Sequence, residues 1–174
     1  MLKNYNKYKV LKVFLDAPTE SHRLREISRA SGVFPKSVMN YLKEFETDEI
    51  IKRFEKNKIP LYTALRDNER FKLYKKLSII YELNVSGFIE ELWNKVSPDA
   101  IILYGSYAKG ESVEDSDIDI FVIGKEKEIN IEIYEKTLGK KIHLMYEAFP
   151  KNISNELKNN LANGIVMKGY FKVF

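Results

Sequence analysis

Hydrophobic residues in the first part of the chain recur at intervals near 3.6 positions, the spacing that gives a helix one apolar face. These intervals predict three helices, over residues 5–15, 22–31 and 35–47. Pro18 ends the first helix, because proline pushes the residue before it out of helical geometry. Gly32 gives the second helix its C-terminal stop. The first part of the chain is therefore predicted to be helical.

The hydrophobic period changes after the third predicted helix. Two short strand-like runs, 50–55 and 61–64, flank a turn that contains Lys56, Asn57 and Lys58. Strand-like runs on either side of a polar turn are typical of a β-hairpin. We therefore expect a hairpin to follow the helices.

The remaining chain mixes helical and strand-like patterns. Residues 68–96 are expected to be helical with a break at Gly87. This segment either packs against a domain core or forms a homodimer interface, and its sequence leaves both alternatives open. Further elements are predicted as strands over 101–104, 120–123 and 165–171, and as helices over 126–138 and 151–162.

Composition narrows the class of protein. The 174 residues are 44% hydrophobic and 31% charged, which is typical of a soluble globular protein of one or two domains. The sequence contains no cysteine and no apolar run near the ~18 residues that a membrane span needs. We therefore expect a cytoplasmic protein without a signal peptide and without a membrane partner.

Charge divides the chain unevenly. Residues 1–66 contain 14 Lys and Arg against 8 Asp and Glu, whereas residues 67–174 contain 15 against 17. A basic first part and a slightly acidic second part suggest two units with different partners, and nucleic acid is the first candidate for the basic part.

Residues 1–66 resemble a winged helix-turn-helix domain, on three helices followed by the stretch SVMNYLKEFETDEIIKRFEKNKIPLYTAL. The resemblance implies that helix 35–47 enters the major groove of DNA and that the hairpin wing contacts phosphates. The residues expected to contact DNA are Lys36, Ser37, Asn40 and Lys43 on the helix and Lys52, Arg53, Lys56 and Lys58 on the wing. The alternative is a solvated charged face on a domain that binds protein.

The strongest chemical signal is the stretch AIILYGSYAKGESVEDSDIDIFVI at residues 100–123. A short apolar strand runs into Gly105 and Ser106, and a second strand opens with Asp117 and Asp119. A period of two places both aspartates on one face, about 7 Å apart, where they would repel without a cation. Two such carboxylates beside a glycine turn suit a hard divalent cation that also binds phosphate.

Gly105-Ser106, ten residues, and then Asp117-x-Asp119 resemble the signature of the DNA polymerase beta–like nucleotidyltransferases, closest to their minimal stand-alone members. The resemblance covers about residues 98–174, including a later NGIVMKG segment. It implies a small mixed sheet flanked by helices and transfer of a nucleoside monophosphate from an NTP, with ATP as the default. It also implies two Mg²⁺ ions at each site.

The resemblance carries over residue by residue. Gly105 and Ser106 match the phosphate-binding pair, and Asp117 and Asp119 match the metal-binding, catalytic pair. Two further positions are expected near the nucleotide, namely Lys109 as a phosphate contact and Ser116 as a residue that orients the turn.

The sequence departs from the family at the third carboxylate. The matching strand holds His143, and Glu147 lies roughly 13 Å further along the backbone. Three interpretations of His143 stay open: a general base for the acceptor hydroxyl, a metal ligand, or a packing residue in a site that has lost part of its chemistry.

The sequence therefore predicts an α+β protein with a winged helix-turn-helix over 1–67, a helical linker over 68–97 and a nucleotidyltransferase domain over 98–174. One hypothesis is an enzyme that moves AMP to an acceptor, such as a partner toxin that it neutralises as an antitoxin. The other is a DNA-binding regulator whose second domain binds nucleotide or mediates assembly with little turnover.

Overall fold

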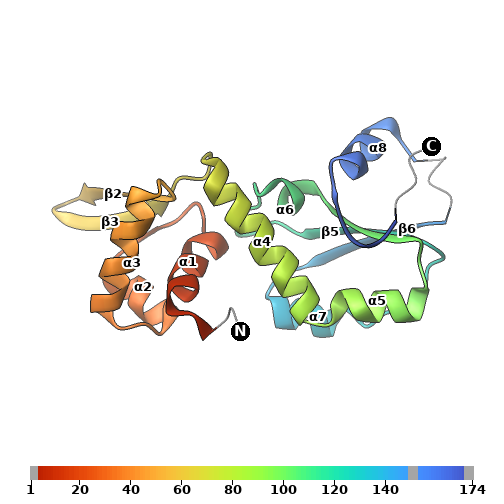
Figure 1. Cartoon of the computed structure of the whole chain (residues 1–174), viewed down its shortest axis with the longest axis horizontal. Helices are drawn as coiled ribbons and strands as arrows, with labels where there is room; N and C mark the ends of the chain where they lie inside the picture. Colours follow the sequence, from red (N-terminus) through yellow and green to blue (C-terminus); the bar gives the residue numbers. More distant parts are fainter. Residues whose placement is uncertain (1–3, 149–152, 171–174) are drawn as a thin grey trace. The chain divides into compact units, whose positions relative to one another are not determined.

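The computed structural model describes residues 4–148 and 153–170, and it divides the chain into two compact units (Figure 1). The first unit is Met1–Tyr74 and the second is Lys75–Phe174. Their boundary falls inside α4 (Glu69–Val85), the first helix of the segment expected as a linker. Within the part of the chain described, no helix combines the length and the hydrophobicity that crossing a bilayer requires.

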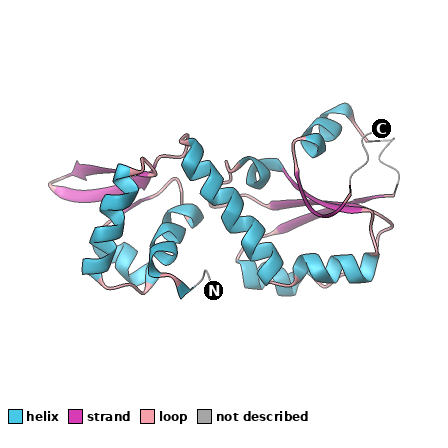
Figure 2. Ribbon diagram, in the orientation of Figure 1, coloured by secondary structure: helices cyan, strands magenta, loops and turns pink. Residues whose placement is uncertain are grey.

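The first unit combines three helices with a small antiparallel sheet (Figure 2). Its strands lie in the order β1-β3-β2. The elements in chain order are α1 (Asn6–Asp16), β1 (Ser21–His22), α2 (Leu24–Ser31), α3 (Pro35–Thr47), β2 (Ile51–Lys56) and β3 (Ile59–Ala64). The three predicted helices and the hairpin are thus present, while the assignment to the winged helix family stays a prediction.

The sequence explains why α3 and the hairpin form where they do. Pro35 occupies the first turn of α3, where its missing N–H costs nothing, and the helix buries Val38, Leu42 and Phe45. The hairpin turns at Asn57 and Lys58, which have φ values of 54° and 62°. Positive φ at both central residues is what a type I′ turn requires.

Strand β1 is an element that the hydrophobic pattern does not predict. Ser21 and His22 pair with Thr63 and Tyr62 of β3. Two residues are too few to show a period, so only the tertiary pairing reveals the strand. His22 stands in this strand with its Nε2 atom buried.

Within the described residues, the second unit contains a four-stranded mixed sheet and four helices after α4. In chain order these elements are α5 (Phe88–Val96), β4 (Ala100–Tyr104), α6 (Gly105–Lys109), β5 (Ile118–Ile123), α7 (Ile131–Leu138), β6 (Ile142–Glu147), α8 (Asn155–Ala162) and β7 (Ile165–Gly169). The predicted helix over 126–138 forms only in its second half. Parts of the elements predicted over 151–162 and 165–171 lie outside the described residues.

The strands of this sheet lie in the order β6-β5-β4-β7, with β4 antiparallel to both neighbours and β5 parallel to β6. Side chains alternate between two faces. Ile101, Leu103 and Ile120 share a core with α5, α6 and α7, while Ile102 and Phe121 share a second core with Leu161 of α8. The whole chain is therefore a mixed α+β protein with two sheets.

Candidate functional site

Strand pairing brings three polar side chains into one row across the second sheet. Asp119 of β5 lies opposite Tyr104 of β4 in the antiparallel pair and beside His143 of β6 in the parallel pair. Directly paired residues point to the same face of a sheet. Asp119 therefore shares with Tyr104 and Phe121 the face that packs against α8.

The bend after β4 fits closely around the Asp119 side chain. Gly105 has a φ of 70°, and a Cβ added there would lie 3.1 Å from Asp119 Cγ and overlap Oδ2. Glycine is the residue that adopts this left-handed conformation without strain. The chain thus needs glycine at position 105 both for the turn and for the approach of the Asp119 carboxylate.

Ser106 and Lys109 lie in the short helix α6, which begins at Gly105. Ser106 is half-buried and Lys109 is exposed in the last turn. Residues three apart on a helix lie on the same side. Ser106 and Lys109 therefore lie on the same side of α6.

The loop between α6 and β5 positions Asp117. Ser116 closes this loop, since its hydroxyl oxygen accepts a hydrogen bond from Val113 N at 2.8 Å. Asp117 is exposed and lies immediately before β5, so it belongs to the loop rather than to the strand. The hydrogen bond with Glu135 raises the pKa of Lys141, and the charge of Asp117 adds to this effect. Asp117 and Lys141 therefore lie near each other at the starts of two parallel strands.

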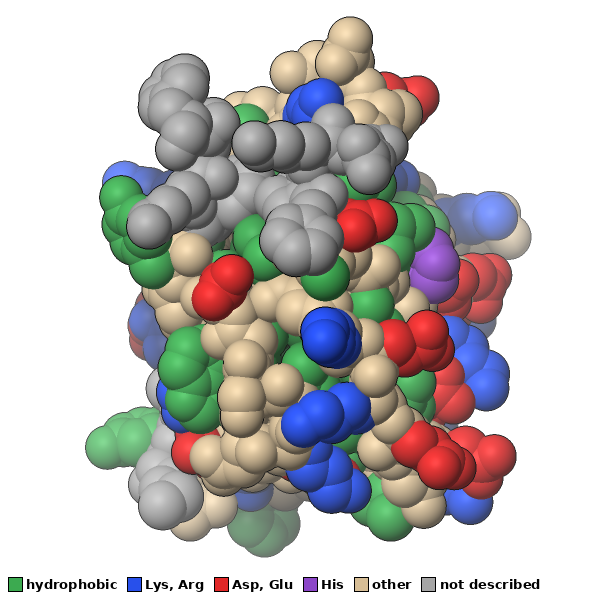
Figure 3. All heavy atoms as spheres, turned by 90° about the vertical axis from the view of Figure 1, so that its right-hand side faces the viewer, with side chains coloured by type: hydrophobic (Ala, Val, Ile, Leu, Met, Phe, Trp, Pro, Cys, Tyr) green, Lys and Arg blue, Asp and Glu red, His purple; other side chains and the backbone are tan. Residues whose placement is uncertain are grey.

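Asp119 and His143 are in hydrogen-bonding contact, with 3.2 Å between Oδ1 and Nδ1. The His143 side chain is 55% exposed and that of Asp119 is 26% exposed. Figure 3 shows a histidine at the molecular surface with acidic side chains close to it. A side chain exposed to this degree is accessible to an acceptor, and the interpretation of His143 as a packing residue does not fit it.

The two aspartates fit a magnesium ion that arrives with phosphate. Magnesium is usually held by one or two carboxylates together with water and substrate phosphate oxygens, whereas imidazole suits softer transition metals. Across residues 4–148 and 153–170, no group of three or more His, Asp and Glu side chains is placed to hold an ion. A magnesium ion at this site would take its carboxylate ligands from Asp117 and Asp119, and phosphate oxygens would complete the ligand set.

Two residues near this site were missed by reasoning from the sequence. Burial, and to a lesser degree the charge of Asp119, raises the pKa of the Tyr104 hydroxyl. Ser112 is 1% exposed, and its hydroxyl has no hydrogen-bond partner among the described residues. The position of Tyr104 directly before Gly105 was an available signal, whereas nothing in the sequence marks Ser112 as buried.

The residues expected to contact DNA are solvent-accessible in the first unit. Lys36, Asn40 and Lys43 lie on the exposed side of α3, and Ser37 is half-buried beside them. On the hairpin, the exposed basic residues are Lys52, Arg53, Lys56 and Lys58. Arg53 forms an ion pair of 3.5 Å with Glu55, so part of its charge is already balanced.

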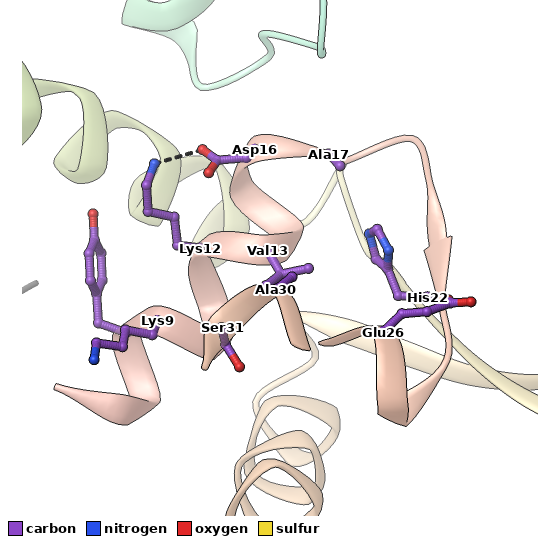
Figure 4. A pocket seen from close by; sticks show the side chains of 10 residues that line it. Lys9, Lys12, Val13, Asp16, Ala17, His22, Glu26, Ala30 and Ser31 are labelled. Atoms are coloured by element: carbon purple, nitrogen blue, oxygen red, sulfur yellow. Dashed lines mark hydrogen bonds and ion pairs between the residues drawn. The ribbon is translucent and has the colours of Figure 1, made fainter. Parts of the chain in front are cut away.

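A separate groove of about 570 Å³ lies within the first unit, between α1, β1 and α2 (Figure 4). Lys12 and Asp16 form an ion pair of 2.7 Å along one wall, and His22 belongs to the lining. None of the residues singled out for nucleotide or DNA lines this groove. The groove is therefore distinct from both candidate sites.

Comparisons with known proteins identify the class of the second unit. Residues 87–169 match the family model described as Polymerase beta, Nucleotidyltransferase. This range contains the glycine–serine bend, both aspartates and His143. The chain therefore contains a polymerase beta nucleotidyltransferase domain at these residues.

One curated relative is more specific in its name. A protein of Methanocaldococcus jannaschii named "Putative protein adenylyltransferase" is 43% identical over 61 residues, which cover 34% of this chain and 49% of that relative. The chain thus spans about half the length of the relative that it matches. The domain and this similarity together support nucleotidyl transfer as the general chemistry of the second unit.

Proposed function

We propose that the second unit binds a nucleoside triphosphate, expected to be ATP, and transfers its nucleoside monophosphate to an acceptor hydroxyl. The observation that carries this proposal is the position of the Asp119 carboxylate against the Gly105 bend. This arrangement places a cation-binding group beside backbone that can approach phosphate closely. The nucleotidyltransferase match over residues 87–169 supports the same chemistry.

In the proposed reaction, the acceptor oxygen forms a bond to the α-phosphorus while the bond from that phosphorus to the β-phosphate breaks. Pyrophosphate leaves, and the hydroxyl proton passes to a base. Ser106 donates hydrogen bonds to phosphate oxygens, and Lys109 adds positive charge. Asp117 and Asp119 would hold the magnesium, with two ions expected, which would supply charge neutralisation at the phosphates and activation of the attacking hydroxyl.

His143 is the proposed base for the acceptor proton. A carboxylate only accepts hydrogen bonds, so the contact with Asp119 Oδ1 requires that Nδ1 of the imidazole carries a proton. In the neutral imidazole, the other nitrogen, Nε2, then keeps a lone pair for the hydroxyl proton. The exposure of the His143 side chain gives an acceptor access to that nitrogen.

The proposed acceptor is a hydroxyl group on a partner protein. The name of the relative from Methanocaldococcus jannaschii supports a protein acceptor and an adenylyl group. We include the case in which the modified partner is a toxin, so that the protein acts as its antitoxin.

Incubation of the protein with α-labelled ATP, Mg²⁺ and candidate acceptor proteins tests the proposed transfer. We expect label to appear on an acceptor and to be lost in the double variant Asp117→Asn and Asp119→Asn. Asp115→Asn is the matched control, because Asp115 is an exposed acid in the same loop. Transfer that persists in the double variant would refute the assigned site.

DNA binding by the first unit is a second proposed function, compatible with the first. The observation that favours it is the exposed basic surface on α3 and the β2–β3 hairpin. Figures 1 and 2 show this helix beside the hairpin in the same unit. If the protein is a DNA-binding regulator, its second unit binds nucleotide or mediates assembly with little turnover.

Retention of duplex DNA at increasing salt concentrations tests this second function. Neutralised phosphates release counterions, so the logarithm of the affinity should fall linearly with the logarithm of salt concentration. Lys56→Gln with Lys58→Gln should reduce the slope by about 2, whereas Lys136→Gln, on α7 of the second unit, should not change it. Lack of retention by the full chain even at low salt would exclude the function.

A further inference from the structure

We propose that Phe34 contacts the methyl group of a thymine in the major groove of the DNA bound by the first unit. This inference rests on the DNA-binding function proposed above. It assigns a sequence-reading role to a residue outside the basic set expected from the sequence.

The exposure of Phe34 is the first observation. Its side chain is 84% exposed, the largest exposed fraction among the large hydrophobic side chains of residues 4–148 and 153–170. The neighbouring Val33 is 3% exposed and belongs to the core of the first unit. Val33 therefore anchors the turn between α2 and α3, and the aromatic ring of Phe34 contributes no burial to it.

The position of Phe34 at the start of α3 is the second observation. Phe34 is the N-cap residue of this helix and makes no capping hydrogen bond with its side chain. Serine, threonine, aspartate and asparagine are preferred at N-caps because their oxygen atoms accept a hydrogen bond from the first turn. Phenylalanine at this position thus provides neither a cap nor a packed side chain, which points to contact with a partner.

The surroundings of Phe34 indicate the chemistry of that partner. Lys36 and Lys43 are exposed on the same helix, and Asn40 is exposed between them. The hairpin next to α3 adds four exposed basic residues. These positive charges are complementary in sign to the phosphates of DNA. The apolar group that the major groove presents is the thymine methyl, which phenylalanine contacts favourably.

The experiment combines a protein substitution with the removal of one methyl group from DNA. The full chain first selects a preferred site from a random duplex library. Each thymine of that site is then replaced in turn by deoxyuridine, which lacks only the C5 methyl group. DNA affinities are measured for the original chain, for Phe34→Ser and for Tyr5→Ala. Tyr5→Ala is the control variant, because Tyr5 is also an exposed aromatic N-cap residue, at the start of α1.

We expect one deoxyuridine replacement to weaken binding by the original chain and by Tyr5→Ala about fourfold, the effect of one buried methyl group. The same replacement should leave Phe34→Ser unaffected. Serine is a good N-cap residue, so this variant should unfold at the same or a higher denaturant concentration, which excludes misfolding as the cause.

Three results would overturn the inference. If deoxyuridine weakens binding equally for the original chain and for Phe34→Ser, Phe34 does not contact the methyl group, although the protein still binds DNA. Loss of label transfer in Phe34→Ser with unchanged DNA affinity would assign the residue to a protein acceptor instead. No DNA retention at any salt concentration would reject both this inference and the DNA-binding function on which it rests.

Discussion

Asp119 is the residue around which the candidate site is built. Its position depends on Gly105, which leaves room for the carboxylate, and on His143, which contacts Oδ1. Pairing with Tyr104 fixes the face of the sheet on which it lies. Because each neighbour comes from a different element, single substitutions can separate their contributions.

Gly105→Ala should reduce nucleotide transfer at least 100-fold. The added methyl group would overlap Asp119 Oδ2 and displace either the carboxylate or the bend. Gly139→Ala is the matched control, since Gly139 has a similar φ of 66° but a Cβ added there would meet no atom of the described residues within 4 Å. Gly139→Ala should lose roughly 1–2 kcal/mol of stability from left-handed strain, measured by urea unfolding, and Gly105→Ala should lose at least as much because of the added overlap. Only Gly105→Ala should lose activity. Equal activity losses would contradict this prediction.

His143→Gln should lower kcat about 100-fold and leave the KM for ATP nearly unchanged, because general-base catalysis contributes about that factor in the transition state. Steady-state kinetics over a range of Mg²⁺ concentrations measure both parameters. If His143 were a metal ligand instead, the substitution would shift the Mg²⁺ dependence of the rate.

At the scale of elements, hydrophobic spacing predicts where helices lie, but it does not predict which elements contact each other. The helices α1, α2, α3, α4 and α5 lie within one or two residues of their predicted positions. In α1, α3 and α5 the reason is a buried apolar stripe near the 3.6-residue period, whereas α4 leaves Leu73 and Leu77 exposed and buries Lys75. Strand β1 and the late start of α7 are missed, since a two-residue strand and an alternating run of isoleucines give no decisive period.

The contact between α5 and α7 gives a prediction at this scale. The Tyr134 hydroxyl donates a hydrogen bond to the Glu91 carboxylate, and this bond, together with burial, raises the pKa of Tyr134 to about 12. Hydrogen bonding with Lys95, and then with Tyr134, lowers the pKa of Glu91. Tyr134→Phe should therefore destabilise the protein by about 1 kcal/mol at neutral pH.

The pH dependence of that loss follows from the two shifts. The raised pKa of Tyr134 means that its contribution is complete below about pH 10 and lost as the pH rises through about 12. The lowered pKa of Glu91 means that its contribution is complete above its ordinary pKa of 4.5 and lost as the pH falls through the lower value. Urea unfolding of both proteins should show the largest difference between about pH 5 and 10. The ring contact with Phe88 is retained in Tyr134→Phe, so a difference independent of pH would contradict the hydrogen bond with Glu91 as its cause.

At the scale of the whole molecule, the two candidate functions occupy different compact units. The basic residues expected to contact DNA lie in the first unit, and the glycine–serine bend and both aspartates lie in the second. Distant sites without shared partners usually contribute additively.

Crossed substitutions test this separation. Asp117→Asn with Asp119→Asn should abolish transfer and change DNA affinity less than twofold. Lys36→Ala with Lys43→Ala should weaken DNA binding at least tenfold and leave transfer unchanged, because removal of two phosphate contacts lowers the electrostatic part of the affinity. Parallel measurements of salt-dependent retention and label transfer on both double variants would reveal any coupling between the units.

The sequence by itself determined the helices, the hairpin and the spacing of Gly105, Ser106, Asp117 and Asp119, because local period and local motif depend only on neighbours along the chain. The tertiary structure decided that His143 stands beside Asp119, across 24 positions of sequence, since the register of a parallel strand pair depends on how the whole sheet packs. It also decided that Asp117 lies in the loop and that Gly105 encloses the Asp119 carboxylate. The close approach of Gly105, Asp119 and His143 follows from the packing of the sheet, and no periodicity along the chain predicts it.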